Sequence, residues 1–261
     1  MEKTRIESAF SSVAYIKHVE LRREAVPRFD LYPFCLDAVR TLDKLSFTKP
    51  VTFLVGENGS GKSTLLEGIA VAYGFNPEGG SRNMNFETKS SHSDLHHYLR
   101  IARGIKKAND GYFFRAESYY NVASQIDILD EDKEATGPPI KMSYGGKSLH
   151  EQSHGEAFFS TFMQRFGGHG IYLMDEPEAA LSPIRQMSLL VRMHELVQKH
   201  SQFIIATHSP ILMSYPGADI YMLDQAGIRE TALEDTDHYV VTRSFMNDRE
   251  AMLRQLLQEE E

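Results

Sequence analysis

Short, strongly apolar segments alternate along this chain with longer segments in which apolar residues recur every three or four positions. The first pattern predicts buried β-strands and the second predicts amphipathic helices. The expected strands are 15–21, 51–55, 111–115, 170–174, 202–206 and 219–223. The expected helices are 62–73, 95–109, 152–165, 182–200 and 248–260. This alternation favours an α/β fold in which helices flank a mostly parallel sheet.

No internal repeat or long low-complexity segment divides the chain, so we expect a single domain over residues 1–261. Runs rich in Gly, Asn and Pro predict loops at 74–83, 130–139 and 167–170. Within the domain we expect a short helical subdomain at about 116–160 and a C-terminal helix over 244–261.

Composition excludes several classes of protein. With 41% apolar and 25% charged residues, the chain has an ordinary globular balance. Its net charge of −8 argues against strong non-specific binding to nucleic acid or to an anionic membrane. The longest apolar runs, 171–174 and 203–206, are far shorter than the roughly 20 residues of a membrane span, so we expect no direct membrane insertion. A single cysteine and an N-terminus without an apolar signal core fit a cytoplasmic location.

A glycine-rich loop lies between the apolar segment 51–55 and the helical pattern that begins at Thr64. Its residues match the G-x-x-x-x-G-K-[ST] spacing of a phosphate-binding loop: Gly56, Glu57, Asn58, Gly59, Ser60, Gly61, Lys62 and Ser63. Glycines let backbone N–H groups approach a triphosphate, and the helix start adds free N–H groups. Lys62 supplies a cation for the β- and γ-phosphates, and the Ser63 hydroxyl is a hard oxygen ligand for Mg²⁺. We therefore predict a Mg-ATP site on residues 56–64.

Acidic and imidazole side chains follow the next two buried-strand patterns. Asp175 and Glu176 end the segment 170–174, and His208 follows the segment 202–206. Parallel strands bring their carboxyl ends to one edge of a sheet, where such folds bind ligands. Asp175 can hold Mg²⁺, Glu176 can polarise an attacking water, and His208 can donate a hydrogen bond to the γ-phosphate.

Together these segments resemble the ATP-binding-cassette (ABC-type) ATPase superfamily, and within it a soluble, non-transporter, AAA/Rad50-like branch of P-loop NTPases. GENGSGKST resembles the Walker A motif, IYLMDEP the Walker B motif with its catalytic Glu, and Thr207-His208 the switch histidine. Residues 179–182 resemble the D-loop. The resemblance implies a P-loop NTPase fold with a helical subdomain and an antiparallel N-terminal strand region. It also implies that Lys62, Glu176 and His208 catalyse ATP hydrolysis.

The segment QSHGE at 152–156 stands where the family has its LSGGQ signature. The resemblance implies that Ser153, Gly155 and Glu156 bind the γ-phosphate held by a second copy of the chain. His154 and Glu156 depart from the usual signature, in a form similar to the Rad50- and SMC-like branches. The same segment also has the pattern of a capping box, with Ser153 and Glu156 at an ordinary helix start. Both interpretations can hold at once.

The family's glutamine loop has no direct equivalent, because no Gln follows the strand that leads into the helical subdomain. Glu117 stands in that place and is a candidate Mg²⁺ ligand, and Gln125 is the alternative. Phe29, Tyr32 and Phe34 precede the phosphate loop and are candidates for stacking on adenine, although aromatic residues there also fit a simple core.

We therefore expect an ABC-type ATPase that forms an ATP-dependent homodimer and acts as a conformational switch on an unidentified protein partner. One alternative is the nucleotide-binding subunit of a transporter, against which the atypical signature and the missing Gln argue. Another is a Rad50/SMC-like DNA-associated ATPase. DNA binding is not favoured, because too few residues separate Lys62 from Asp175 for a coiled coil and the net charge is −8. A nucleotide sensor that barely hydrolyses ATP is the remaining alternative, and the presence of Glu176 and His208 argues against it.

Overall fold

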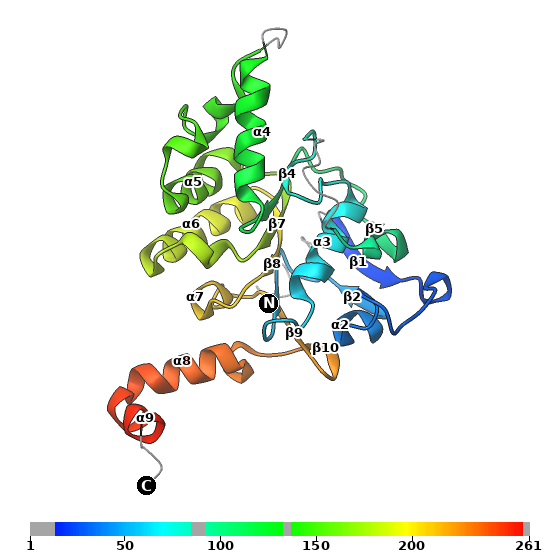
Figure 1. Cartoon of the computed structure of the whole chain (residues 1–261), viewed down its shortest axis with the longest axis vertical. Coiled ribbons are helices and arrows are strands. Elements are labelled where there is room, and N and C mark those ends of the chain that lie inside the picture. Colours follow the sequence, from blue (N-terminus) through cyan, green and yellow to red (C-terminus); the bar gives the residue numbers. More distant parts are fainter. Residues whose placement is uncertain (1–13, 85–91, 133–136, 258–261) are drawn as a thin grey trace.

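A computed structural model of the chain describes residues 14–84, 92–132 and 137–257 (Figure 1). Its strands are β1 (Ile16–Leu21), β2 (Lys44–Ser46), β3 (Val51–Val55), β4 (Gly80–Ser81), β5 (Leu99–Arg103), β6 (Asp110–Arg115), β7 (Gly170–Asp175), β8 (Gln202–Ala206), β9 (Asp219–Asp224) and β10 (Gly227–Glu230). Its α-helices are α2 (Asp37–Arg40), α3 (Lys62–Tyr73), α4 (Tyr119–Glu131), α5 (His154–Ser160), α6 (Pro183–Gln198), α7 (Pro210–Met213), α8 (Asp237–Asn247) and α9 (Arg249–Leu256).

A seven-stranded sheet in the order β10-β9-β3-β8-β7-β6-β4 forms the centre of the described chain (Figure 1). The strands from β9 to β6 in this order run parallel, and β10 and β4 pair antiparallel at the two edges. The predicted mostly parallel sheet is confirmed. Since β8 lies between β3 and β7, the carboxyl ends of these three strands meet side by side.

Alternate residues of the parallel strands face opposite sides of this sheet. On one side, Phe53, Tyr172 and Phe203 join a core that includes residues of α4, α5, α6 and α7. On the other side, Leu54 and Ile204 pack with residues of α3 and of the N-terminal strands. Both faces are covered, which explains why these strands are continuous apolar runs in the sequence.

A separate antiparallel sheet in the order β2-β1-β5 confirms the expected N-terminal strand region. The helix predicted over 95–109 is wrong, because a short 3₁₀ turn at Asp94–Tyr98 leads directly into β5. Leu99 and Ile101 pair with Leu21 and Val19 of β1. Their spacing of two residues suits a strand, and this long-range pairing decides between the two structures.

The helical segments differ from prediction in three places. Helix α4 is absent from the individually predicted helices but lies in the segment 116–160, where a short helical subdomain is expected. The helix expected over 152–165 is α5 followed by a π-helical turn at Thr161–Arg165. Helix α9 falls within the helix predicted over 248–260, and the Asp248 carboxylate caps it by accepting a hydrogen bond from the Ala251 N–H. The C-terminal helix expected over 244–261 is divided at Asp248, because residues 244–247 belong to α8. The end of the helix predicted over 248–260 and of the C-terminal helix expected over 244–261 lies outside the described residues, which stop at 257.

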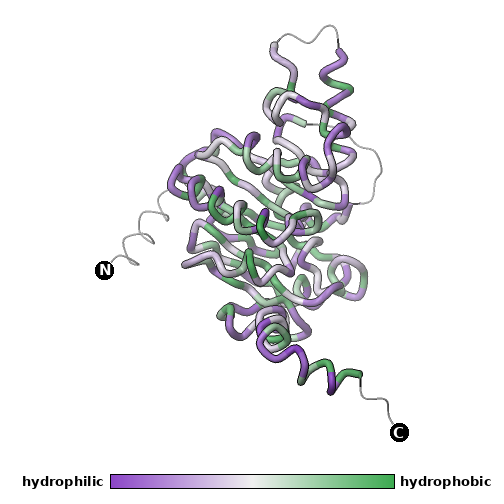
Figure 2. Tube along the Cα trace, turned by 90° about the vertical axis from the view of Figure 1, so that its left-hand side faces the viewer, coloured by the Kyte–Doolittle hydropathy of each residue, from purple (hydrophilic) through white to green (hydrophobic). Residues whose placement is uncertain are grey.

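Helices α8 and α9 extend away from the main sheet as a C-terminal arm (Figures 1 and 2). Neither helix contains a buried residue, and α8 contacts α7 near its start. Among the described residues, no helix is both long and apolar enough to cross a bilayer.

Candidate active site

The glycine-rich loop connects β3 to the start of α3, as its sequence predicts. Gly56 has a φ of +146°, and a β-carbon there would lie 2.2 Å from the Leu223 carbonyl oxygen at the end of β9. Glycine is therefore needed at this position both for its backbone conformation and for the close approach of the loop to β9. Gly61, with a φ of +95°, then allows the chain to turn into the first residue of α3.

Lys62 is buried inside the loop that carries it. Its ammonium group donates hydrogen bonds to the carbonyl oxygens of Gly56 and Glu57, at 2.8 and 3.0 Å. Burial lowers the pKa of Lys62, and the nearby carboxylates of Glu176 and Asp175 oppose that effect. The loop thus holds a cation at its centre, where an anionic group can replace the two carbonyl oxygens as its partner.

Ser63 and Asp175 meet although they lie far apart in the sequence. The Ser63 hydroxyl donates to a carboxylate oxygen of Asp175 at 2.9 Å. Burial raises the pKa of Asp175 to about 6, against the effects of Arg115 and the Ser63 hydrogen bond. Nowhere in the described ranges do three or more His, Cys, Asp or Glu side chains form a metal cluster. One hydroxyl and one carboxylate suit Mg²⁺, which takes most of its ligands from phosphate and water oxygens.

Glu176 and His208 lie at the ends of the neighbouring strands β7 and β8. A carboxylate oxygen of Glu176 is 3.7 Å from Nε2 of His208. Glu176 has a φ of +49°, a conformation uncommon for a residue with a β-carbon, and its N–H donates to the Ala206 carbonyl at 2.9 Å. Backbone strain of this kind is typical of functional sites. The structure therefore brings together the two residues that the sequence assigned to hydrolysis.

Glu178 has a role at this site that the sequence analysis missed. Its carboxylate accepts hydrogen bonds from the Thr207 hydroxyl at 2.7 Å and from the His208 N–H at 2.6 Å. Burial raises the pKa of Glu178, and these hydrogen bonds oppose the rise. Glu178 thus ties the loop after β7 to the loop after β8. In the sequence, Glu178 could have been noticed as the third acidic residue of the run DEPE, two positions after the catalytic candidate Glu176.

The signature segment forms the start of α5. Ser153 and Glu156 make a complete capping box, in which the Glu156 carboxylate accepts from both the N–H and the hydroxyl of Ser153. The capping-box interpretation is therefore confirmed. A β-carbon on Gly155 would lie 2.6 Å from the Ala180 carbonyl oxygen, so glycine is needed for α5 to pack against the D-loop segment.

Arg115, rather than Glu117, is the charged side chain next to Asp175. Its guanidinium is 3.9 Å from the Asp175 carboxylate and forms a buried ion pair with Glu67 at 2.8 Å. The Glu117 side chain is 88% exposed and approaches the other side of the same guanidinium at 3.8 Å. Among the described residues, no contact joins Glu117 directly to Ser63 or Asp175. Gln125, the alternative, lies within α4, and in the described part of the chain no contact joins it to Ser63 or Asp175.

Of the three aromatic candidates, Tyr32 is the one that lies open beside the phosphate loop. Its side chain is 63% exposed, and its hydroxyl is 3.2 Å from the Thr64 hydroxyl. Phe34 is buried and packs edge-on against Phe29 and Tyr98, which makes it a core residue.

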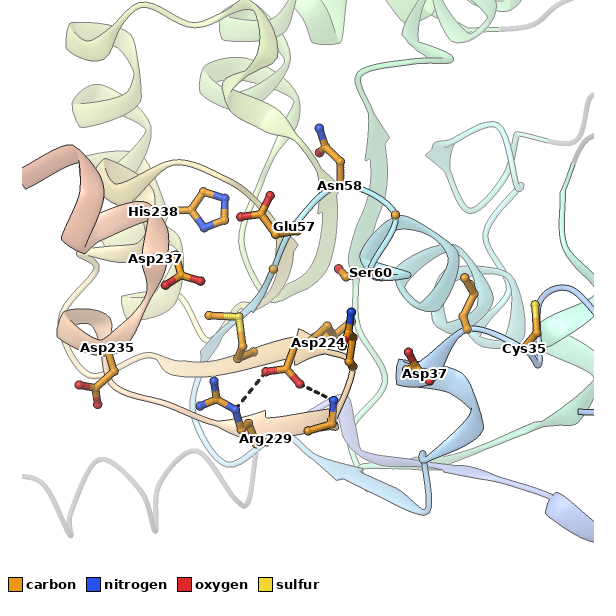
Figure 3. Close-up of a pocket in the computed structure, with 17 residues that line it drawn as sticks. Cys35, Asp37, Glu57, Asn58, Ser60, Asp224, Arg229, Asp235, Asp237 and His238 are labelled. Atoms are coloured by element: carbon orange, nitrogen blue, oxygen red, sulfur yellow. Dashed lines mark hydrogen bonds and ion pairs between the residues drawn. The ribbon is translucent and has the colours of Figure 1, made fainter. Parts of the chain in front are cut away.

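A cavity of about 680 Å³ borders the outer side of the phosphate loop (Figure 3). It lies between α2, the turn that joins β9 to β10, and the start of α8, and its acidic lining includes Asp37, Glu57, Asp224, Asp235 and Asp237. These carboxylates would repel a triphosphate. Lys62 is not part of the lining, so the phosphate site is better placed at the Lys62 and Ser63 side of the loop.

Two family models match the chain. A model described as an AAA domain matches residues 36–157. A second AAA-domain model, whose description names the AbiEii toxin and a Type IV TA system, matches residues 149–214. The two matches together run from before the phosphate loop to beyond His208.

Curated relatives and solved structures agree with these matches. The xylose/arabinose import ATP-binding protein XylG of Sulfolobus acidocaldarius is 28% identical over 213 residues, which is 73% of this chain and 81% of that protein. An ABC transporter ATP-binding protein of Caldanaerobacter subterraneus is 28% identical over 176 residues, or 61% of this chain and 70% of its own length. The ADP conformation of MJ1267, an ATP-binding cassette of an ABC transporter, has a TM-score of 0.50 at 18% identity and covers 88% of this chain and 98% of its own. At 18% identity, the similarity to MJ1267 shows a shared fold.

Proposed function

This chain belongs to the ABC-type P-loop ATPases, and on that premise we propose that it binds and hydrolyses Mg-ATP and forms an ATP-sandwiched dimer that acts as a switch on a protein partner. The observation that carries the proposal is the 2.9 Å contact between Ser63 at the start of α3 and Asp175 at the end of β7. It joins the phosphate loop to the acidic pair.

Binding of the triphosphate would use the loop as it is already folded. The Lys62 ammonium, which now donates to two loop carbonyls, would turn to the β- and γ-phosphate oxygens. Free N–H groups at the start of α3 would meet the remaining phosphate oxygens. Thr64 and the exposed ring of Tyr32 next to it would face the ribose and the base.

Ser63 and Asp175 would hold Mg²⁺. When bound, the ion neutralises phosphate charge and orients the γ-phosphate for in-line attack. Asp175 is suited to this role because burial destabilises its carboxylate, and pairing with a cation would recover that cost.

Hydrolysis would depend on Glu176 and His208. Glu176 would accept a hydrogen bond from the attacking water and orient it toward the γ-phosphate. His208 would donate from Nε2 to a γ-phosphate oxygen and stabilise the charge that develops there. The separation of 3.7 Å between these two groups leaves them close enough to act on one phosphate.

The dimer would be completed by the signature segment of a second copy. Since Gly155 packs on Ala180, a displacement of α5 would be passed to the D-loop of the same chain. Glu156 stands where the usual signature has Gln, and its carboxylate already accepts from Ser153. Closure over ATP would therefore require this capping box to rearrange or to bind the γ-phosphate through other donors.

The helical subdomain offers a surface for the protein partner. We place that surface where the apolar side chains of Tyr120, Ile128 and Met142 are exposed. The names of the two curated relatives make the nucleotide-binding subunit of a transporter the second candidate function, with the same surface facing the membrane component.

The Glu176→Gln variant tests both the reaction and the dimer. We expect its ATP hydrolysis to fall by at least about 100-fold, as is usual when a general base is lost, with ATP binding retained. Light scattering should then show one chain of 29.6 kDa without nucleotide and a dimer with Mg-ATP. Glu195→Gln, on the exposed face of α6, is the matched control and should behave like the wild type. Unchanged turnover in Glu176→Gln would overturn the assignment of Glu176. A molecular mass that stays the same when Mg-ATP binds would overturn the proposed dimer switch.

A further inference from the structure

The C-terminal arm reaches the active site through one side chain. His238, in the first turn of α8, places its Nε2 atom 2.8 Å from Nδ1 of His208. The two imidazole rings are 4.9 Å apart between centroids and tilted by 56°, so the contact is a hydrogen bond between ring edges rather than a stack. Figure 3 shows His238 projecting from α8 toward the phosphate loop, on the side of Glu57.

The other nitrogen of His208 faces Glu176. This Nε2 atom is 3.7 Å from the Glu176 carboxylate, and it is buried without a hydrogen-bond partner in the described part of the chain. The His208 ring thus lies between Glu176, on its Nε2 side, and His238, on its Nδ1 side. In a neutral histidine, the hydrogen bond made by one ring nitrogen determines whether the other nitrogen carries the proton.

His208 is held mainly neutral in this environment. Burial lowers its pKa, and the charges of Lys62 and His238 lower it further, while Glu176 and Glu57 act in the opposite direction. A neutral imidazole carries one proton, so His208 can offer an N–H at Nε2 only if Nδ1 is the acceptor. The negative charge of Glu176 favours a proton on the nitrogen that faces it.

We propose that His238 is a positioning residue for ATP hydrolysis: its Nε2–H donates to Nδ1 of His208 and so keeps an N–H on the Nε2 atom that faces the γ-phosphate. This inference rests on the proposed function. Without His238, the proton of His208 can move to Nδ1, and a bare Nε2 would repel a phosphate oxygen. Through the same contact, any movement of α8 relative to the sheet changes the hydrolysis site, which gives the exposed arm a means of regulating turnover.

Steady-state ATP hydrolysis of five proteins tests the proposal: wild type, His208→Ala, His238→Ala, the double variant and His238→Gln. We expect His238→Ala to lower kcat by about 10- to 100-fold, the range typical when the hydrogen-bond partner that orients a metal-binding histidine is removed, and to leave KM for ATP within about twofold. The double variant should be no slower than His208→Ala alone, because the two side chains act as one unit. His238→Gln, whose amide can donate from a similar position, should recover most of the rate.

Two results would overturn the inference. One is a wild-type kcat in His238→Ala, and the other is a loss in the double variant equal to the product of the two single losses, which would indicate a general structural effect. Val241→Ala, an exposed position on the same helix, controls for disturbance of α8 and should hydrolyse ATP normally. Failure of the proposed function is recognised separately, because the wild type would then show no Mg-dependent hydrolysis at all.

Discussion

Replacing Asp175 with Asn should stabilise the nucleotide-free protein while it removes Mg-dependent turnover. Burial raises the pKa of this carboxyl from 3.8 to about 6. A folded protein with a raised carboxyl pKa binds a proton that the unfolded chain has already released, so its stability falls as the pH rises from about 4 to about 6. A shift of about two units corresponds to about 3 kcal/mol above that range.

The size of this stability difference depends on which interactions of Asp175 an Asn side chain retains and which it removes. Its amide oxygen can still accept the hydrogen bond of Ser63, which is 2.9 Å away in the wild type. The attraction of Arg115 for the carboxylate is already included in the shifted pKa. We therefore expect Asp175→Asn to be more stable than the wild type by about 2–3 kcal/mol at pH 8 and about equal to it at pH 4. Under the proposed function, this is the cost of keeping a carboxylate at the Mg²⁺ site.

Urea unfolding followed by circular dichroism at pH 4, 5, 6 and 8 measures this difference. The control is Asp224→Asn, whose carboxylate is more exposed and lies 3.2 Å from Arg229, and it should change stability by no more than about 0.5 kcal/mol. A stability difference for Asp175→Asn that is the same at pH 4 and pH 8, or a loss of stability at pH 8, would refute the reasoning.

Two further pairs of substitutions separate binding from folding. Arg115→Met leaves the buried Glu67 without its cationic partner, although Ser93 still donates to its carboxylate, and should lower the free energy of unfolding by about 3 kcal/mol in urea titrations. Glu117→Gln, at an 88% exposed side chain, should change it little. Tyr32→Ala should weaken ATP binding by about tenfold in calorimetry with an unchanged melting temperature, because a base stacked on an aromatic ring gains about 1–3 kcal/mol. Phe34→Ala, in the core, should instead lower the melting temperature and leave ATP affinity unchanged. Equal effects of the two substitutions on ATP affinity would contradict the assignment of Tyr32.

Local patterns were sufficient for the parts of the fold that are buried on both sides. Strands β3 and β8 and helix α3 have the predicted bounds, because a covered parallel strand is a continuous apolar run and a glycine stands at each end of α3. Strand β5 was missed for the opposite reason. It is partly exposed and is stabilised by pairing with β1, a partner that no local window of sequence contains.

The same distinction applies to the active site. Lys62, Ser63 and Asp175 could be assigned from sequence because each belongs to a short motif whose spacing follows from phosphate chemistry. Arg115 and His238 belong to no motif, and each acquires its role only when the fold places it beside a motif residue.

His208 shows why such supporting residues matter. Its main chain is held by Glu178, which accepts from its N–H, and its ring is held by His238, which contacts Nδ1. Two separate elements, the loop after β7 and the first turn of α8, therefore determine where the His208 Nε2 atom lies and which proton it carries. If ATP hydrolysis responds to the C-terminal arm, the response should pass through the ring contact and not through the Glu178 contact, because in the described part of the chain the ring contact is the one that joins His208 to α8. Glu178→Gln should then lower turnover in the wild type and in His238→Ala by the same factor, whereas His208→Ala should remove the effect of His238.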